Sequence, residues 1–401
     1  MPSSRKNTIL FSIISFLLFL PSCQSASTAT AETAPSPTIS VPTEMPTQAP
    51  TESPLVAPQI LPTFSNITPY SLPAGINPLT GLPPTLPELL ERRPIASKIA
   101  LYPRYVRTIN AGLSLSDVVF EYYIESGLTR FIAVFYGNNA ERIGPVRSGR
   151  FFDEHIARMY QSYLVFKYAD KRVYEYLKST DIHKFMIVPG NSYCPPFIIG
   201  EKELDTYNNI FLDSTKFSDC LEKQKKDDTR PNLRTGYFSD LPPSSGEIAL
   251  GIFTRYSLDD YHYWEYQSIT NKYYRHQEAN GLRNGEAPAY APLIDTLTGD
   301  QVTADNVIFL FVPHTFDDQF QEEDEVYHID LIGLGKAILF RDGRVYPAYW
   351  RRVASNQPLL ITDRNGTPLP LKPGRTFYQV LGESSRVADE NNLWYFQFDT
   401  P

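Results

Sequence analysis

The sequence of 401 residues has few of the residue patterns that most often carry catalysis. Its histidines show no metal-ligand spacing and no HExxH pair; they are His155, His183, His262, His276, His314 and His328. A GxSxG elbow, a P-loop and a GxGxxG turn between a strand and a helix are also missing. These absences argue against zinc proteases, serine hydrolases of the α/β type and nucleotide-binding enzymes. We therefore expect no cofactor and no metal.

Cysteine is scarce, with three residues in the chain. If Cys23 is modified, as argued below, Cys194 and Cys220 remain as an even pair. In an oxidising compartment such a pair can form a disulfide. The alternative is two buried thiols, because unpaired cysteine is commonly buried.

Positive charge is also in short supply. The chain has 37 Lys and Arg against 45 Asp and Glu, which gives a formal charge of -8. Removal of Arg5 and Lys6 with a signal peptide would change this to -10 (-8 minus 2). Most of such a surface repels nucleic acid and anionic lipid, so nucleic acid is not an expected partner. A local basic site remains compatible with this charge.

A long hydrophobic run occurs only near the start, from Thr8 to Leu20. As a helix these 13 residues would measure ~20 Å, which is too short for a ~30 Å hydrocarbon core. With the basic residues before it, the run predicts a signal peptide over residues 1–22. The following Leu20-Pro21-Ser22-Cys23 resembles the lipobox of bacterial lipoproteins, although Pro21 is uncommon at its position. The resemblance implies cleavage before Cys23, a lipid on its sulfur, and a protein anchored at the extracytoplasmic face of the cell membrane.

Residues 23–75 are rich in Ser, Thr, Ala and Pro and show no apolar periodicity. A segment of this composition cannot bury enough apolar surface to offset the entropy of ordering. We expect a disordered linker that holds the folded part away from the bilayer.

Residues 76–245 are expected to form an α+β domain. Strands are predicted over 94–102, 118–124 and 129–136, the last two as a hairpin through Ser126-Gly127. A helix is predicted from Ser148 to Tyr160, because its apolar residues have helical spacing.

Residues 246–401 are expected to form a mostly-β domain. Tyr261–Tyr266 and Lys272–His276 are predicted to pair as a hairpin, and Asp342-Gly343 is a strong two-residue turn signal. Further short strands are predicted over 307–312, 336–340, 344–350, 359–362 and 377–381. The high content of Tyr (26) and Phe (24) favours β-structure and aromatic-lined surfaces.

Several motifs together resemble the YerB-like family of bacterial lipoproteins. They are residues 77–83, Ser116-Asp117-Val118-Val119 with Glu121, Glu125-Ser126-Gly127, Thr129-Arg130-Phe131, Gly144-Pro145-Val146-Arg147-Ser148 with Arg150, Thr298-Gly299, Asn306-Val307, and Lys372-Pro373-Gly374-Arg375-Thr376. The resemblance covers about residues 77–383 and implies an envelope lipoprotein built of two parts. The family pattern has histidines near Pro231-Asn232 and near Ala289 that this chain lacks, so an activity that uses those imidazoles is not expected.

The candidate ligand-binding residues are Glu121, Glu125, Arg130, Arg147, Ser148 and Arg150. Strand alternation predicts that both glutamates lie on one face of their strand. The arginines after Gly144-Pro145 lie near the predicted helix start, where backbone amides and guanidinium groups favour an anion. One interpretation is a pocket for a carboxylate, phosphate or glycan group. The other, which we favour at this point, is an internal Glu–Arg network that fixes the hairpin to the helix.

Two functions follow from these residues. The first is a noncatalytic binding or accessory protein of the envelope, which contacts cell-wall glycan, another anionic ligand or an envelope protein. The second is an envelope hydrolase acting on cell-wall glycan or peptide. A pairing of Glu121 with Glu125 does not fit a hydrolase, because positions four apart on a strand lie ~13 Å apart and glycosidase carboxyls lie ~5–9.5 Å apart.

Overall fold

The computed structural model describes residues 72–189, 197–200, 205–233, 236–317 and 326–399. They all belong to one unit of the chain, Pro42–Pro401. The predicted signal peptide, the lipidation site at Cys23, all but the last four residues of the predicted linker, and Cys194 of the possible disulfide lie outside the described residues. Within the described part, no helix has the length and apolar character needed to cross a membrane.

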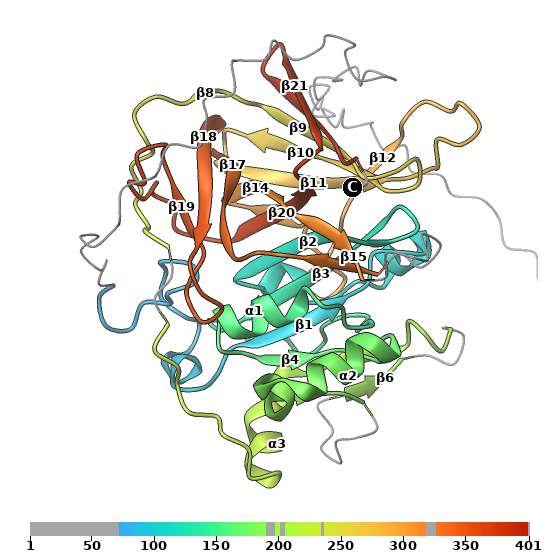
Figure 1. The fold of residues 1–401 in the computed structure, drawn as a ribbon, viewed down its shortest axis with the longest axis vertical. Coiled ribbons are helices and arrows are strands. Elements are labelled where there is room, and N and C mark those ends of the chain that lie inside the picture. Colours follow the sequence, from blue (N-terminus) through green and yellow to red (C-terminus); the bar gives the residue numbers. More distant parts are fainter. Residues whose placement is uncertain (1–71, 190–196, 201–204, 234–235, 318–325, 400–401) are drawn as a thin grey trace, which may run out of the picture. The chain divides into compact units, whose positions relative to one another are not determined.

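Eleven of the described strands form the first sheet (Figure 1). Its order is β19 (Leu360–Thr362), β18 (Arg344–Arg352), β17 (Gly333–Arg341), β14 (Asn306–Val312), β20 (Thr376–Gly382), β2 (Val118–Glu125), β3 (Leu128–Phe135), β1 (Ile95–Ile99), β4 (Tyr163–Val165) and β5 (Met186–Ile187), with β8 (Glu247–Ile248) paired to β18. The central strands β14 and β20 are buried along their whole length. This burial explains why their sequences are nearly continuous runs of apolar residues and do not alternate between apolar and polar residues.

Seven described strands form the second sheet. Its order is β12 (Tyr290–Pro292), β11 (Lys272–Glu278), β10 (Tyr261–Gln267), β9 (Gly251–Arg255), β22 (Leu393–Gln397) and β21 (Arg386–Glu390), with β13 (Thr303–Ala304) paired to β11. Two small sheets contain β15 (His314–Phe316) with β16 (Tyr327–Ile329), and β6 (Phe197–Ile199) with β7 (Ile210–Leu212).

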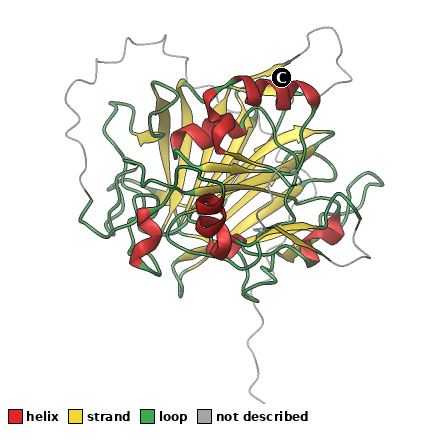
Figure 2. Ribbon diagram, turned by 90° about the horizontal axis from the view of Figure 1, so that it is seen from below, coloured by secondary structure: helices red, strands yellow, loops and turns green. Residues whose placement is uncertain are grey.

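The helices of the described chain are short and lie against the strands (Figure 2). The α-helices are α1 (Asp153–Met159), α2 (Lys171–Ser179) and α3 (Phe217–Lys223), and the 3-10 helices are η1 (Pro87–Glu91), η2 (Arg104–Thr108), η3 (Leu113–Leu115), η4 (Asp181–Phe185) and η5 (Ser214–Lys216). Helix α3 buries Cys220, the described member of the possible disulfide. Together these elements confirm the expected fold class, a mixed N-terminal part with α and β structure and a mostly-β C-terminal part.

The first sheet contains strands from both halves of the chain. Strand β20 pairs in parallel with β14 on one side and with β2 on the other. Phe120 of β2 stacks on Tyr378 of β20 with ring centroids 4.5 Å apart, and Phe131 of β3 meets Phe377 edge-on at 6.0 Å. Residues near 120 and near 378 are therefore packed as one core, although about 260 residues separate them in the sequence.

Strand β2 has a different neighbour on each face. On one face, Phe120 and Tyr122 contact Phe152 beside α1, with ring centroids 6.2 and 4.6 Å apart. On the other face, the first sheet packs against the second, where Trp264 meets Phe377 at 4.8 Å. Charged residues of β2 that point toward the second sheet are consequently enclosed between two β-layers.

Candidate functional site

A β-bulge in the hairpin separates the two candidate glutamates. Up to Tyr123 the register of β2 with β3 is regular, with Glu121 opposite Phe131 and Tyr122 opposite Arg130, and it then shifts between Tyr123 and Glu125. Because a one-residue shift exchanges the faces of a strand, Glu125 lies on the side of Arg130 while Glu121 lies on the other. The prediction that both glutamates share a face was wrong, and the bulge is the reason.

Glu121 lies inside the protein and is fully buried. Arg275 of β11 binds it with both terminal nitrogens, Nη1 to Oε2 at 2.8 Å and Nη2 to Oε1 at 2.9 Å. The Thr129 hydroxyl lies 3.0 Å from Oε1. Glu121 therefore takes part in an ion pair between the two sheets and does not line a surface site with Arg147 or Arg150.

Glu125, Arg130 and Arg150 meet at the end of the hairpin. Arg150 Nη2 donates to Glu125 Oε1 at 2.6 Å, and Arg130 Nη2 lies 3.8 Å from the same oxygen. The Glu125 side chain is 41% exposed, whereas Arg130 and Arg150 are 7% and 8% exposed as residues. The carboxylate thus forms the outer edge of a cluster whose cationic groups lie deeper.

Arg147 and Ser148 belong to an extended segment beside this group. The Arg147 backbone donates to Lys98 of β1 and accepts from Lys167, and Gly149 donates to the backbone of Tyr168. Ser148 is half-buried between the two arginines. Arg147 Nη1 donates to Asn208 Oδ1 at 3.3 Å. The segments around 147–150 and 167–169 therefore run side by side and bring their basic residues together.

The predicted helix begins later than its apolar spacing indicated. Helix α1 starts at Asp153 and not at Ser148, because residues 147–149 are held in an extended conformation by their neighbours. The Asp153 carboxylate accepts the Arg150 backbone N–H at 2.8 Å. This carboxylate of the chain itself binds a backbone amide just before the helix, and an anionic ligand beside Arg147 stays a prediction.

Positive charge exceeds negative charge in this region. Arg130, Arg147 and Arg150, called here the arginine cluster, are joined by Lys98 underneath and Lys167 at the side. Burial, and then the charges of Arg150 and Arg147, lower the pKa of Arg130 to about 9, while Glu125 opposes the shift. Burial likewise lowers the pKa of Lys98 to about 7, even though Asp153 forms an ion pair with it at 3.2 Å. These groups repel one another and stabilise any negative charge placed among them.

Two buried nitrogens of the cluster have no hydrogen-bond partner among the described residues. They are Nη1 of Arg130 and Nε of Arg147. A buried guanidinium nitrogen without an acceptor is costly, on the order of 1–3 kcal/mol. Both atoms are donors, and an acceptor oxygen is the kind of atom that would satisfy them.

Exposed tyrosines surround the arginine cluster. Tyr168 is 62% exposed and Tyr207 is 66% exposed. Lys167 Nζ lies 5.4 Å from the centroid of the Tyr168 ring, and the Arg147 guanidinium lies 5.7 Å from that of Tyr207. Tyr168 has a φ of 59°, a left-handed conformation that is strained for an aromatic residue. Strain of this kind occurs most often where a function fixes a side chain.

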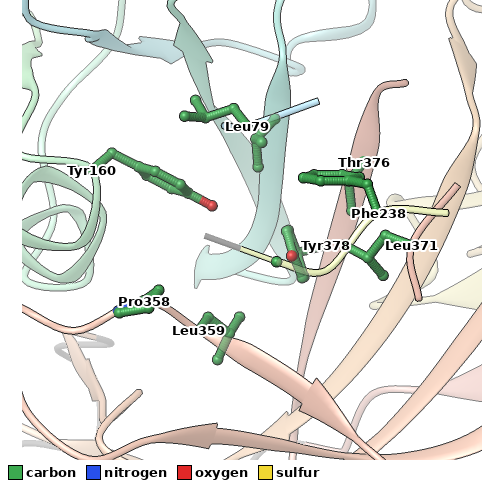
Figure 3. A pocket seen from close by; sticks show the side chains of 10 residues that line it. Leu79, Tyr160, Phe238, Pro358, Leu359, Leu371, Thr376 and Tyr378 are labelled. Atoms are coloured by element: carbon green, nitrogen blue, oxygen red, sulfur yellow. The ribbon is translucent and has the colours of Figure 1, made fainter. Parts of the chain in front are cut away.

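Two cavities elsewhere in the described chain do not coincide with the arginine cluster. The first, of about 10 Å³, lies among apolar side chains such as Leu79, Phe238 and Leu371, with the Tyr160 hydroxyl directed toward it (Figure 3). It has room for one water at most. The second, of about 260 Å³, lies between Tyr174, Lys178, His183 and Lys226. The first cavity is too small for a ligand, and the second contains none of the candidate residues.

The structure thus brings Glu125, Arg130 and Arg150 together, with Arg147 and Ser148 alongside, and separates Glu121 from them. Sequence reasoning missed Lys98, Lys167 and Tyr168. The signal for Lys98 was its place inside the apolar run Ile95–Ile99, where an unpaired charge is costly. Lys167 and Tyr168 carried no comparable signal, because their contribution depends on the pairing with residues 147–149.

Family models match both parts of the chain. The model described as "Protein of unknown function (DUF3048) N-terminal domain" matches residues 79–227, and the one described as its C-terminal domain matches residues 252–378. The expected division into a mixed N-terminal part and a mostly-β C-terminal part agrees with this order. The exact boundary at residues 245 and 246 stays a prediction.

Most of the chain matches the YerB protein of Bacillus subtilis in two comparisons, one with its sequence and one with its crystal structure. The Bacillus subtilis (strain 168) protein named "Putative lipoprotein YerB" is 25% identical over 312 residues, which are 76% of this chain and 85% of that protein. The crystal structure of the YerB protein from Bacillus subtilis matches with a TM-score of 0.63 at 22% sequence identity, over 76% of this chain and 96% of that chain. The structural likeness concerns the fold, and the chain is a distant homologue of that protein.

Proposed function

The chain belongs to the DUF3048 family, whose N-terminal and C-terminal domains it carries in that order, and from this premise we propose that it is a lipid-anchored envelope protein that binds an anionic glycan at the arginine cluster. The observation that carries the proposal is the buried Nη1 of Arg130, which has no acceptor among the described residues. A carboxylate or phosphate oxygen supplies that acceptor together with the compensating charge.

The tyrosines favour a sugar as the carrier of the anion. Tyr168 and Tyr207 are exposed beside Lys167 and Arg147, so a ring of the ligand can pack on an aromatic face while its acidic group reaches the cations. The Glu125–Arg150 ion pair also joins the hairpin to the segment before α1, as the structural interpretation expected. That pair leaves Nη1 of Arg130 and Nε of Arg147 without partners among the described residues, and the structural interpretation therefore does not account for the whole cluster.

The anchor is the second part of the proposal. The sequence Leu20-Pro21-Ser22-Cys23 and the name of the Bacillus subtilis relative both support lipid attachment at Cys23. The residues between Cys23 and the folded part would let the arginine cluster reach a polymer beyond the bilayer. Mass spectrometry of the N-terminal peptide from membranes tests this directly. A cleaved, acylated Cys23 is expected, and an unmodified Cys23 in the mature protein would contradict the anchor.

Binding is tested by sedimenting the full chain carrying Cys23→Ser with insoluble cell-wall glycan. We expect the wild-type cluster to bind, and we expect binding to fall at least tenfold in Arg147→Gln and several-fold in Tyr168→Ala. Arg364→Gln and Tyr349→Ala are matched controls at exposed positions outside the cluster, and both should bind as the parent does. Two arms identify the charge: amidation of the carboxylates of the glycan, and removal of its phosphate. Equal binding by Arg147→Gln, or equal binding after both treatments, would overturn the proposal.

A further inference from the structure

A second cluster of polar groups lies between the two sheets, on the opposite face of β2 from the arginine cluster. It contains Glu121 of β2, Asp260 directly before β10, and His262 of β10. The three residues are 0%, 3% and 0% exposed. One carboxylate oxygen of each acid and one ring nitrogen of the histidine all lie within 4.8 Å of one another, and His262 Nδ1 lies 3.8 Å from Glu121 Oε1.

Several atoms of this cluster have no hydrogen-bond partner among the described residues. They are both ring nitrogens of His262 and Oδ1 of Asp260. Buried polar atoms in native proteins are almost always paired, and a group of unpaired ones requires an explanation. The neutral imidazole offers one ring nitrogen with a free electron pair, and Asp260 Oδ1 offers another, so one nitrogen and one oxygen of the three can bind a metal ion while the second ring nitrogen carries a proton.

Gln379 of β20 adds a fourth candidate ligand to Glu121, Asp260 and His262. It is the register neighbour of Glu121 in the parallel pairing of β2 with β20, and it is fully buried. Among the described residues neither its side-chain oxygen nor its nitrogen has a partner in hydrogen-bonding geometry, although the amide is close enough to His262 to favour the charged form of that ring. One nitrogen and two oxygens thus lie within 4.8 Å of one another, and the Gln379 amide, on the neighbouring strand of the first sheet, lies beside His262.

The protonation of these groups is compatible with a cation. Burial, and then the charge of Arg275, lower the pKa of His262 to about 3, so the ring is neutral and can act as a ligand at neutral pH. Burial, together with the nearby Glu121 charge, raises the pKa of Asp260 to about 6. A positive charge beside these carboxylates would relieve that repulsion.

Arg275 is the main opposing group. Its guanidinium already holds Glu121 through both oxygens, and its charge disfavours a second cation nearby. Glu121 Oε2 can keep its hydrogen bond to Arg275 Nη1 while Glu121 Oε1 binds a metal ion. Ligand atoms of a tetrahedral site lie roughly 3.4 Å apart for bonds of about 2.0–2.1 Å. The distances between the ligand atoms in this structure would therefore have to shorten by on the order of 1 Å.

We propose that Glu121, Asp260, His262 and Gln379 bind a single first-row divalent metal ion that joins the first sheet to the second. The mixed imidazole and carboxylate donors suit Zn²⁺ or Mn²⁺ better than Ca²⁺ or Mg²⁺. A site enclosed on all sides is filled during folding, and its metal therefore adds to the stability of the folded state. The proposal is independent of the arginine cluster, which lies on the other face of β2.

The test is to refold the full chain with and without Zn²⁺, Mn²⁺, Ca²⁺ or Mg²⁺, to remove free metal, and to measure metal content and thermal midpoint. Binding of about one equivalent of Zn²⁺ or Mn²⁺ with a higher midpoint is expected. With Co²⁺ as a spectroscopic probe, d–d absorption without a thiolate band is expected, because no cysteine is among the ligands. A chain that retains no first-row metal after refolding would overturn the proposal and leave buried water as the occupant.

Variants assign the ligands. His262→Gln and Asp260→Asn should each weaken Zn²⁺ retention at least tenfold and remove the rise of the thermal midpoint. His276→Gln is the matched control, because His276 lies in the adjacent strand and contacts Glu265 at 3.5 Å outside this cluster. A folded His262→Gln variant that retains Zn²⁺ as well as the wild type does would overturn the assignment of His262 as a ligand. If a variant does not fold, the stoichiometry and the Co²⁺ spectrum of the wild-type chain still decide.

Discussion

Arg150 donates to Glu125 at 2.6 Å, and this ion pair joins the end of the β2–β3 hairpin to the segment that precedes α1. The carboxylate is half-exposed and the guanidinium is buried. Glu125 is also the acid nearest to Arg130 in the described structure, at 3.8 Å. It therefore acts as an internal counter-charge for the arginine cluster and competes with any anionic ligand for the same donors.

The first prediction follows from this competition. Glu125→Gln removes the internal counter-charge, and we expect the full chain to bind an anionic sugar several-fold more tightly as a result. Isothermal titration at constant ionic strength measures the effect. Glu390→Gln is the control for net charge, because Glu390 is exposed on β21 and lies outside the arginine cluster. Weaker binding by folded Glu125→Gln would mean that the carboxylate contributes to the ligand site and does not compete with it.

The second prediction concerns pH. Burial lowers the pKa of Lys98 from its ordinary value of 10.5 to about 7, with Asp153 opposing the shift. Between pH 7 and 9 the unfolded chain keeps a proton on Lys98 that the folded chain releases, and the free energy of unfolding therefore rises with pH. Between pH 7 and pH 9 we expect the free energy of unfolding to rise by about 2 kcal/mol more in the wild type than in Lys98→Met. Urea unfolding at both pH values measures it, and parallel pH dependences would contradict the assignment.

The third prediction concerns the ion pair between the sheets. Glu121→Gln leaves the Arg275 charge buried without its carboxylate, and we expect a loss of about 3 kcal/mol in the free energy of unfolding. Glu121→Gln combined with Arg275→Met should be less destabilised than the single variant, because the uncompensated charge is gone. Urea unfolding of both, with Glu265→Gln as the control on β10, provides the measurement. A single variant as stable as the wild type would contradict the role of this pair.

The fourth prediction concerns the dependence of the N-terminal part on the C-terminal part. A fragment of residues 76–245 lacks β20, so β2 loses its parallel partner and Phe120 loses the Tyr378 ring. We expect this fragment to show no cooperative unfolding transition, whereas the full chain shows one. Hydrogen exchange of the backbone amides measures the stability of individual strands, and we expect fast exchange in β2 of the fragment. A cooperatively folded fragment with slow exchange in β2 would show that the first sheet does not need β20.

Much of the strand order followed from the sequence. The predicted hairpin of Tyr261–Tyr266 with Lys272–His276 corresponds to β10 and β11, and Asp342-Gly343 forms the turn between β17 and β18. In these cases local residues decide the structure, since alternation and turn chemistry act over a few positions. The joining of distant strands, such as β2 with β20, depends on packing of the whole chain and carried no local signal.

The candidate site shows the same limit. Glu125 and Arg130 were found because charges beside apolar strand residues stand out in the sequence, and Arg150 was found because it follows Gly144-Pro145 near the predicted helix start. The bulge after Tyr123 was not predictable from alternation, and it moved Glu125 to the opposite face. The ion pair of Glu121 with Arg275 spans 154 residues of sequence, and nothing near either residue indicated its partner. Contacts between sheets are decided by topology, which local patterns do not encode.

The measurement that tests the central claim most directly is the affinity of the full chain for a phosphorylated or carboxylated disaccharide, compared between wild type and Arg130→Gln at constant ionic strength. Arg130 carries one of the two buried cluster nitrogens that have no partner in the described part of the chain, and its loss should weaken binding roughly ten- to a hundredfold. Arg364→Gln should bind as the wild type does. A folded Arg130→Gln chain that binds either sugar as tightly as the wild type would contradict the account.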